Sequence, residues 1–454
     1  MARTAKKETS LTAEEKLAQI LVPKDEHEYQ LPSNWRWIIL GNLVSIKRGA
    51  SPRPIKAYIT DDEHGVNWIK IGDSDSGKYI THIKEKVTEG GAQKSVFVEK
   101  GTLLLSNSMS FGRPYILAVD GCIHDGWLAI TPGQAFNKEY LYYALLASEW
   151  YFERVAVGTA VRNLNSDRVA ATPVPLPPLA EQQRIVDRIE SLFAKLDEAK
   201  EKAQAVVDGF EDRKAAILHK AFTGELTAEW RKRKGADFQN TWHFSPLGEY
   251  ASNQYGYTEK SSYESIGPKF LRITDIQDGQ VVWKDVPYCK IDNDLKEKYS
   301  LKVGDIVVAR IGATTGKSYM VIDEVDAVYA SYLIRVSIRK KDTLSSKYLY
   351  YFMQCPSYWQ QITELSSGIA QPGVNGNKLK TLRLPIPEIK EQEEIVKCLD
   401  YLLPIERQAR DSAELVLDQI DAMKKAILAR AFRGELGTND PTDESAEELL
   451  KRII

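Results

Sequence analysis

The chain contains the same stretch of sequence twice. Residues 214–226 read KAAILHKAFTGEL and residues 424–436 read KKAILARAFRGEL, so nine of 13 positions are identical at an offset of 210. The same offset aligns PLPPLAEQQRIV at 175–186 with PIPEIKEQEEIV at 385–396. Unrelated helices share a hydrophobic period but not runs of identical residues, so these pairs indicate an internal duplication.

The sequence between these shared stretches has diverged around a common framework. The offset is 203 where Gly101 corresponds to Gly304, and 208 where Tyr140 corresponds to Tyr348. Two scaffolds with different loop lengths and side chains are expected when both copies do the same kind of work on different targets.

Apolar residues follow a 4-3 heptad spacing through each copy of the shared region, which predicts two long helices of about 40 residues, or roughly 60 Å. The expected seams are Ile185, Ile189, Leu192, Leu196, Ala199, Ala203, Val206, Phe210 and Ile217, and Ile395, Leu399, Leu402, Ala409, Ala413, Val416, Ile420, Met423 and Ile427. The narrow, alanine-containing seam favours an antiparallel coiled coil between the copies over helices packed on their own domains. Arg213 interrupts the first seam, Glu406 lies on the second, and Pro404 should kink or restart the second helix.

The blocks that precede the helices mix short apolar, strand-like runs with helical segments and polar loops. The expected fold class is therefore α+β: two pseudo-symmetric globular domains joined by two long antiparallel coiled-coil helices, as a dumbbell. The expected divisions are an N-terminal extension at 1–30, domains at 31–176 and 241–386, spacer helices at 177–223 and 387–433, a linker at 224–240 and a tail at 434–454. Short similarities of 11–14 to 226–229, and of 12–15 to 445–448, indicate that the N-terminal segment resembles the C-terminal tail; if the two lie side by side, the molecule has cyclic pseudo-twofold symmetry.

Composition excludes several classes of protein. The chain is 43% hydrophobic and 27% charged, which is typical of globular domains. The chain has no long apolar run, and its N-terminus is polar. We therefore expect neither a membrane span nor a signal peptide, and we expect a cytoplasmic location. Its four scattered cysteines predict neither a disulfide framework nor a zinc site. The formal net charge is −2, so nucleic-acid binding would need locally concentrated positive charge.

No sequence motif predicts a catalytic or metal site in this chain. Gly312 to Ser318 reads GATTGKS, which has three residues between its glycines where a phosphate-binding P-loop has four. The six histidines show no metal-ligand spacing. No nucleophile elbow is present either.

Polar loops in both copies carry side chains that can contact DNA. A basic loop follows the opening of the first block, a glycine–cation turn follows a predicted buried strand in each block, and an Arg/Asn/Gln loop precedes each long helix; such side chains bind phosphates or base edges. A solvated surface charge is the alternative for any one of them. The predicted DNA-binding residues are Lys47, Arg48, Arg53, Lys56, Asn107, Arg113, Arg162, Asn163, Asn165, Tyr255, Tyr257, Lys260, Arg310, Thr314, Thr315, Lys317, Gln371 and Asn375.

Together, the two variable blocks and the repeated P-x-P-x-x-x-E-Q-x-x-I-V and A-I-L-x-x-A-F-x-G-E-L motifs resemble the specificity subunits of type I restriction-modification enzymes. The resemblance implies that each block is a target recognition domain for one half of a split, asymmetric site in double-stranded DNA, and that the helices set the spacing. It also implies two modification (methyltransferase) subunits with S-adenosylmethionine, and motor-nuclease restriction subunits with ATP and Mg. No cofactor is expected in this chain, and the N-terminal extension is expected to dock a subunit.

Two other kinds of function remain open from sequence. One is a structural coiled-coil adaptor whose blocks bind proteins. The other is a duplicated nuclease or hydrolase, for which the chain lacks a recognisable catalytic constellation.

Overall fold

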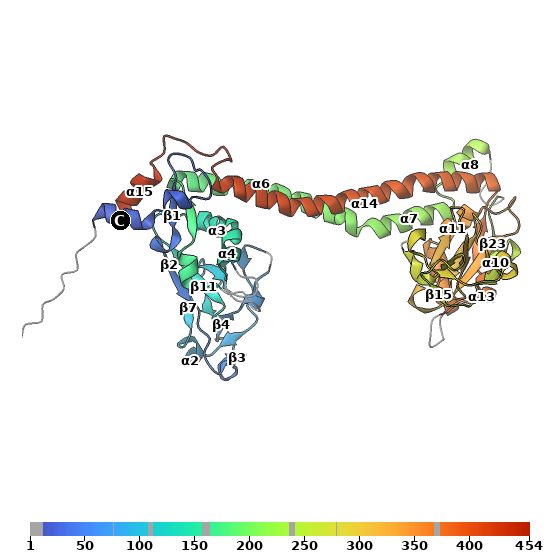
Figure 1. Cartoon of the computed structure of the whole chain (residues 1–454), viewed down its shortest axis with the longest axis horizontal. Coiled ribbons are helices and arrows are strands. Elements are labelled where there is room, and N and C mark those ends of the chain that lie inside the picture. The colour runs from blue at the N-terminus through green and yellow to red at the C-terminus, as the bar shows by residue number, and fades with distance from the viewer. Residues whose placement is uncertain are drawn as a thin grey trace, which may run out of the picture. The chain divides into compact units, whose positions relative to one another are not determined.

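The computed structural model describes residues 12–75, 77–107, 112–156, 164–235, 241–277, 279–366 and 373–454. The chain forms two compact units, the first made of residues 1–201 with 416–454 and the second of residues 202–415. Helices α6 (Leu179–Asp208) and α14 (Ile389–Phe432) each contribute residues to both units (Figure 1). Sheets and helices are mixed in each unit, so the predicted α+β class is confirmed.

Unit 1 contains two five-stranded sheets. The first has the order β2-β11-β8-β9-β5, with β2 (Val44–Arg48), β11 (Trp127–Pro132), β8 (Leu103–Ser106), β9 (Pro114–Leu117) and β5 (Tyr79–Ile80). The second has the order β3-β6-β4-β10-β7, with β3 (Ile59–Thr60), β6 (Lys86–Val87), β4 (Val66–Ile69), β10 (Gly121–Ile123) and β7 (Val96–Val98). The remaining elements are α1 (Ala13–Ile20), α2 (Glu89–Ala92), α3 (Lys138–Ala147), α4 (Glu149–Val155), α5 (Ser166–Ala170), α15 (Ala446–Ile453) and the antiparallel pair β1 (Arg36–Ile39) and β12 (Pro173–Leu176).

Unit 2 repeats this plan, but its two main sheets have four strands each instead of five. Its sheets are β14-β23-β20-β21, with β14 (Ala251–Tyr255), β23 (Leu333–Ile338), β20 (Ile306–Ala309) and β21 (Ser318–Met320), and β15-β19-β16-β22, with β15 (Ser261–Ser262), β19 (Tyr288–Cys289), β16 (Lys269–Leu271) and β22 (Ala327–Tyr329). Two-stranded pairs are formed by β13 (His243–Pro246) with β24 (Arg383–Ile386), and by β17 (Ile276–Gln277) with β18 (Gln280–Val281). The helices are α7 (Phe210–Phe222), α8 (Ala228–Lys234), α10 (Asn293–Tyr299), α11 (Ser346–Phe352), α12 (Pro356–Ser366) and α13 (Gly376–Lys380).

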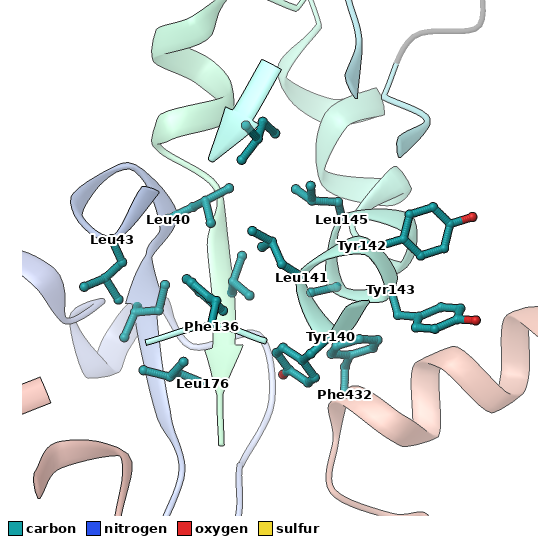
Figure 2. Packing of buried hydrophobic residues seen from close by; sticks show 14 of the residues in the cluster. Leu40, Leu43, Phe136, Tyr140, Leu141, Tyr142, Tyr143, Leu145, Leu176 and Phe432 are labelled. Atoms are coloured by element: carbon teal, nitrogen blue, oxygen red, sulfur yellow. The ribbon is translucent and has the colours of Figure 1, made fainter. Parts of the chain in front are cut away.

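The core of each unit includes side chains from both repeats. In unit 1, Phe432 of α14 packs against Tyr140 of α3, with ring centroids 5.3 Å apart, beside Leu141 and Leu176 (Figure 2). In unit 2, Phe222 of α7 packs against Tyr348 of α11 at 5.1 Å. Buried aromatic rings supply large apolar areas, so the A-F of each A-F-x-G-E-L motif anchors the end of one helix in the domain that the other repeat builds.

The long helices pair antiparallel in each unit, as predicted. In unit 2, Arg213 contacts Glu406 and Phe210 contacts Arg410, so residue numbers rise along one helix as they fall along the other. Of the two predicted effects of Pro404, a kink or a restart, the restart is wrong, because α14 continues through it as one helix of 44 residues. The first helix is the divided one: α6 ends at Asp208, and α7 starts after Gly209. Glycine is a weak helix former, so this position is a natural place for the interruption.

Part of the predicted seam of α14 does not face a partner. Ile395, Leu399, Ala413 and Ile420 are buried, but Ala409 is exposed and Val416 and Met423 are 40% and 46% exposed. Cations meet the facing rings instead: Arg410 lies 4.7 Å from the centre of the Phe210 ring in unit 2, and Lys424 lies 5.1 Å from that of Phe193 in unit 1. A cation over an aromatic face is stabilising and buries the stem of the long side chain, so it replaces apolar packing there.

A buried glutamine fixes the start of each long helix against its own domain. Gln182 Nε2 donates to the backbone oxygens of Ala135 (2.8 Å) and Pro177 (3.1 Å), and its Oε1 accepts from Asn137 N at 2.7 Å. Gln392 Nε2 donates in the same way to Thr343 and Pro387, both at 2.8 Å, and its Oε1 accepts from Ser345 N at 3.0 Å. Each amide therefore satisfies three backbone groups.

The preceding glutamates are buried as well. Glu391 accepts hydrogen bonds from Thr227 Oγ1, at 2.7 Å, and from Arg231. Glu181 correspondingly accepts from Thr438 Oγ1 at 2.7 Å and from Arg184. Burial raises the pKa of Glu181, and the bonds from Thr438 and Arg184 oppose that shift. These contacts explain why the E-Q pair occurs in both copies of the motif. The glutamate binds the segment that follows the end of the other repeat's helix, and the glutamine binds the domain that precedes its own helix.

In unit 1, the helix that begins at Ala13 lies beside the C-terminal helix. Helices α1 and α15 contact each other, and Lys16 Nζ donates to the Ile454 backbone oxygen at 3.1 Å. Arg36 of β1 also forms an ion pair with Glu447 of α15 at 2.8 Å.

We expect Glu391→Ala to destabilise unit 2 by about 3–5 kcal/mol, because it leaves the buried Arg231 guanidinium without its carboxylate. Urea unfolding with hydrogen exchange resolved to unit 2 measures this. Glu393→Ala is the matched control, since Glu393 is exposed on the same helix. Equal stability of the two variants would contradict the role given to the cluster.

We expect Arg213 and Glu406 to be coupled by about 0.5–1 kcal/mol, because the pair is only partly shielded from solvent, with 38% and 24% of the side chains exposed. A double-mutant cycle of Arg213→Ala and Glu406→Ala, followed by denaturant unfolding, measures the coupling. Strictly additive effects would show that the two charges stabilise the helix pair independently.

Candidate nucleic-acid interface

In unit 1, three loops meet at one edge of the β2-β11-β8-β9-β5 sheet. Strands β2 and β8 end where β11 begins, because Arg48 is paired with Leu128 and Ser106 with Trp127. The loops after β2 and β8 and the loop before β11 therefore come together. Leu164 N donates to the Asn107 backbone oxygen at 2.9 Å, which adds the loop before α5. We call the described parts of 47–56, 107–113, 124–126 and 164–165 the loop edge of unit 1.

The same four loops meet in unit 2. Tyr255 at the end of β14 is paired with Ile334, and Ala309 at the end of β20 with Leu333. Val374 N donates to the Arg310 backbone oxygen at 2.9 Å, as Leu164 does to Asn107. The described parts of 255–260, 310–317, 330–332 and 373–375 form the loop edge of unit 2.

A glycine holds two of these loops close together in each unit. Gly49 N donates to Trp127 O at 2.9 Å, and a Cβ on Gly49 would lie 2.2 Å from the His124 backbone oxygen. Gly256 N donates to Leu333 O at 3.1 Å, and its Cβ would lie 2.2 Å from the Ala330 oxygen. A side chain would therefore separate the loops at both positions.

The basic loop of unit 1 surrounds an acidic residue. Arg48 Nε donates to the Asp125 backbone oxygen at 3.2 Å, and the Arg53 guanidinium, with 84% of its side chain exposed, lies 3.9 Å from the Asp125 carboxylate. Ser51 Oγ donates to that carboxylate at 2.6 Å and lowers the pKa of Asp125, against the effect of partial burial. Lys47 and Lys56, in the same stretch of sequence, are exposed. The edge thus offers several cationic donors and one anionic acceptor.

The polar residues next to these cations hold the loops together. Asn107 is buried, and its Nδ2 donates to the Asp125 backbone oxygen at 2.9 Å. Asn165 Oδ1 caps α5 by accepting from Arg168 N at 2.9 Å, and the Arg113 guanidinium lies 5.4 Å from the centre of the Tyr115 ring. Arg162 and Asn163 lie outside the described residues.

Unit 2 places an arginine and a tyrosine at its loop edge. The Arg310 guanidinium lies 5.1 Å from the centre of the Tyr255 ring, and Tyr255 Oη accepts from Gly376 N at 2.9 Å. Arg310 occupies the position after the buried strand that Asn107 occupies in unit 1. Equivalent scaffold positions therefore carry a cation in one unit and a buried amide in the other.

The other predicted residues of unit 2 lie in the loops after β14 and β20 and before α13. Tyr257 is half-buried and Lys260 is exposed, in the loop after β14. Thr314 is half-buried, whereas Thr315 is buried and donates through Oγ1 to the Gly312 oxygen at 2.8 Å. Lys317 is exposed, and Asn375 Oδ1 caps α13 by accepting from Lys378 N at 2.9 Å. Gln371 lies outside the described residues.

Sequence reasoning missed residues that the topology brings to the two edges. Asp125, in the loop before β11, accepts from Ser51 in the loop after β2. Tyr332, in the corresponding loop before β23, accepts a hydrogen bond from Arg310 N through its backbone oxygen at 3.1 Å. Gly49 and Gly256 could have pointed to these residues from the sequence, because each glycine directly follows a strand and the two strands align at an offset of 207.

The described residues form neither a metal site nor a membrane span. Among them, no group of three or more His, Cys, Asp or Glu side chains could hold a metal ion. No described helix is both long enough and apolar enough to span a bilayer.

A known domain family and several of its relatives match this chain. The family model for the type I restriction modification DNA specificity domain matches the chain twice, at residues 32–207 and 241–415. The EcoBI specificity subunit of Escherichia coli is 25% identical over 92% of each chain, and the MjaVIII specificity subunit of Methanocaldococcus jannaschii is 24% identical over 91% of this chain and 95% of its own.

Solved structures share the fold. The HsdS subunit of Thermoanaerobacter tengcongensis is 22% identical with a TM-score of 0.63, and covers 90% of this chain and 100% of its own. A chain from work on complex assembly and conformational transition of the type I R-M system has a TM-score of 0.67 at 21% identity, with the same coverage. Because the domain model matches most of its length, this chain belongs to the type I restriction modification DNA specificity domain family and carries two copies of that domain.

Proposed function

We propose that each loop edge reads one half of a split site in double-stranded DNA, and that the chain is the DNA-recognition subunit of a type I restriction-modification complex. The observation that carries this proposal is the repeated loop edge. Both units bring the same four loops to one sheet edge, but with different side chains at equivalent positions, such as Asn107 and Arg310. Two readers on one scaffold then select two different base sequences.

The chemistry of the two edges suits this task. Exposed cations such as Arg53 and Lys260 can neutralise phosphates, and arginine can bind a guanine edge through two donors. Asp125 adds an acceptor for a cytosine amino group. Asn107, Thr315 and the capping asparagines Asn165 and Asn375 act through the loops that they hold, because their side chains already bind the backbone.

The proposed partners supply the chemistry that this chain is not expected to perform. Two modification subunits carry S-adenosylmethionine and methylate adenine, and motor-nuclease restriction subunits use ATP and Mg; the complex works in the cytoplasm. The N-terminal extension, 1–30, docks a subunit. Two DNA specificity domains favour this proposal over a protein-binding adaptor or a duplicated nuclease. The decisive experiment is selection of bound duplexes from a random library by the chain assembled with its modification subunits, and a preference for no interrupted sequence would refute the proposal.

We expect Arg310→Ala to weaken binding to the selected duplex by about 1–3 kcal/mol and to relax selectivity in one half-site only. Arg53→Ala should do the same for the other half-site. Binding to libraries randomised in one half at a time measures both effects. Lys390→Ala, an exposed cation at the start of α14, is the control. Loss of selectivity in both halves from either variant would contradict separate readers.

We expect Arg113→Ala and Lys317→Ala to weaken DNA binding for all sequences alike, because each cation lies within a loop edge, at the end of the segment that follows a buried strand. Titrations at several salt concentrations should show a salt slope that is smaller by about 1 for each phosphate contact removed. Unchanged affinity and slope for both variants would remove these two residues from the interface.

We expect seven residues inserted into both α6 and α14 to lengthen the unread spacer by about 3 base pairs, since seven helical residues span roughly 10.5 Å and base pairs rise about 3.4 Å. Both half-sites should stay the same. Methylome sequencing of cells that carry the variant complex measures the spacer. Altered half-sites at an unchanged spacing would refute the ruler role of the helices.

A further inference from the structure

Unit 2 contains a cleft between its domain and its long helices. The cleft has a volume of about 930 Å³, and its walls come from α7, β17–β18, β21, α11 and α14. The charged residues that line it are five cations, Lys214, Lys317, Lys347, Arg407 and Arg410, and two acids, Glu211 and Asp323. Lys347 pairs with Asp400, Arg410 with Asp411 and Lys214 with Glu211, so two cations, Lys317 and Arg407, remain against one acid, Asp323.

In unit 1, the corresponding place is filled by the chain itself. Strand β5 pairs parallel with β9: Ile116 N donates to Lys78 O, and Ala118 N donates to Ile80 O, both at 2.9 Å. Lys78 lies 5.2 Å and 4.9 Å from the ring centres of Tyr142 and Tyr143. It also forms ion pairs with Glu139 and, at 2.8 Å, with Glu190.

In unit 2, the matching strand edge has no added strand. Strand β21 lies at the end of its sheet, and its Met320 and Ile322 correspond to Ile116 and Ala118. No described residue accepts a hydrogen bond from the Met320 or Ile322 backbone N–H. The segment equivalent to β5 folds on itself as the β17–β18 hairpin and lines the cleft, and Ile322 is 62% exposed. An edge of unpaired N–H and C=O groups is a template for another strand.

The unit 2 cleft and the site of β5 in unit 1 differ in charge at one equivalent position. Glu139 of unit 1 corresponds to Lys347 of unit 2, and Glu190 corresponds to Asp400. Lys347 itself neutralises Asp400, at 2.7 Å, so the two positions whose acids bind Lys78 in unit 1 form an ion pair with each other in unit 2. Lys317 and Arg407 line the cleft without an ion pair among the described residues.

From this open edge and its surplus of cations, we infer that the unit 2 cleft binds an extended acidic segment of a partner protein, which adds to β21 as a parallel strand. The segment takes the place that β5 fills in unit 1, and its carboxylates face the cations of the cleft. Because alternate side chains of a strand point to opposite faces, its other side chains face apolar lining such as Met320, Ile322 and Val281. This inference does not depend on DNA reading at the loop edges.

The test uses the full chain and a synthetic seven-residue peptide that alternates glutamate and valine, with a lysine–valine peptide of the same length as the control. The acidic peptide should slow hydrogen exchange of the Met320 and Ile322 amides, and should bind about tenfold more tightly than the basic one in fluorescence anisotropy. Binding of neither peptide, equal affinity for both, or protection elsewhere but not at these amides would overturn the inference.

Two variants connect the binding to the cleft. Arg407→Glu should lower affinity for the acidic peptide about tenfold, whereas Lys397→Glu, the same charge change at an exposed site of the same helix outside the cleft, should leave it within about twofold. Met320→Pro removes one outward N–H and should abolish protection of the edge. If this variant does not fold, the Arg407 and Lys397 pair alone decides, and equal effects of these two substitutions would refute the site.

A DNA duplex of random sequence tests whether the cleft binds nucleic acid instead of an acidic peptide. Protection of the Met320 and Ile322 amides by the duplex, without protection by the acidic peptide, would assign the cleft to nucleic acid and overturn the inference. Protection by the peptide alone supports it.

Discussion

A buried carboxamide at the start of each long helix fixes the direction in which that helix leaves its domain. Gln182 and Gln392 each bind the end of a proline-rich strand connection and the start of the domain's own helix, through three hydrogen bonds to the backbone. A buried amide without these partners would be strongly unfavourable, so the angle between helix and domain tolerates little change. The position of each loop edge relative to its own helix depends on this constraint, and so does any measurement of distance along the helix.

The duplication, the α+β class and the antiparallel pairing were predictable because identical residues and hydrophobic period report directly on them. The helix details were not. Proline removes one hydrogen bond but leaves those before and after it, so Pro404 fits within α14, whereas Gly209 marks the end of α6. The sequence pattern assigned Val416 and Met423 to the seam because it assumed that only apolar residues face the partner helix. Lys424 packs over the Phe193 ring, so a long cationic side chain can take such a position.

At the loop edges, the residue types predicted which side chains are polar, but not whether each one faces solvent or binds the backbone. Asn107, Asn165 and Asn375 look like base-reading amides in the sequence, and in the structure each binds the backbone. Which donors remain available depends on how the loops close, and that follows from sheet register and from the contacts of Gly49 and Gly256, which a single sequence does not reveal. The acidic residue Asp125 becomes meaningful only once Arg48, Ser51 and Arg53 are seen around it.

The anchoring of Phe432 on Tyr140 and of Phe222 on Tyr348 has an evolutionary consequence. Neither repeat completes its own core, because each lends its helix end to the domain of the other, so the arrangement is a reciprocal exchange within one polypeptide. An ancestor half as long would have left these aromatic pockets vacant as a monomer, and two such molecules could have filled them mutually. Fusion of the two genes would then have preserved the exchange while freeing each half to acquire a different specificity.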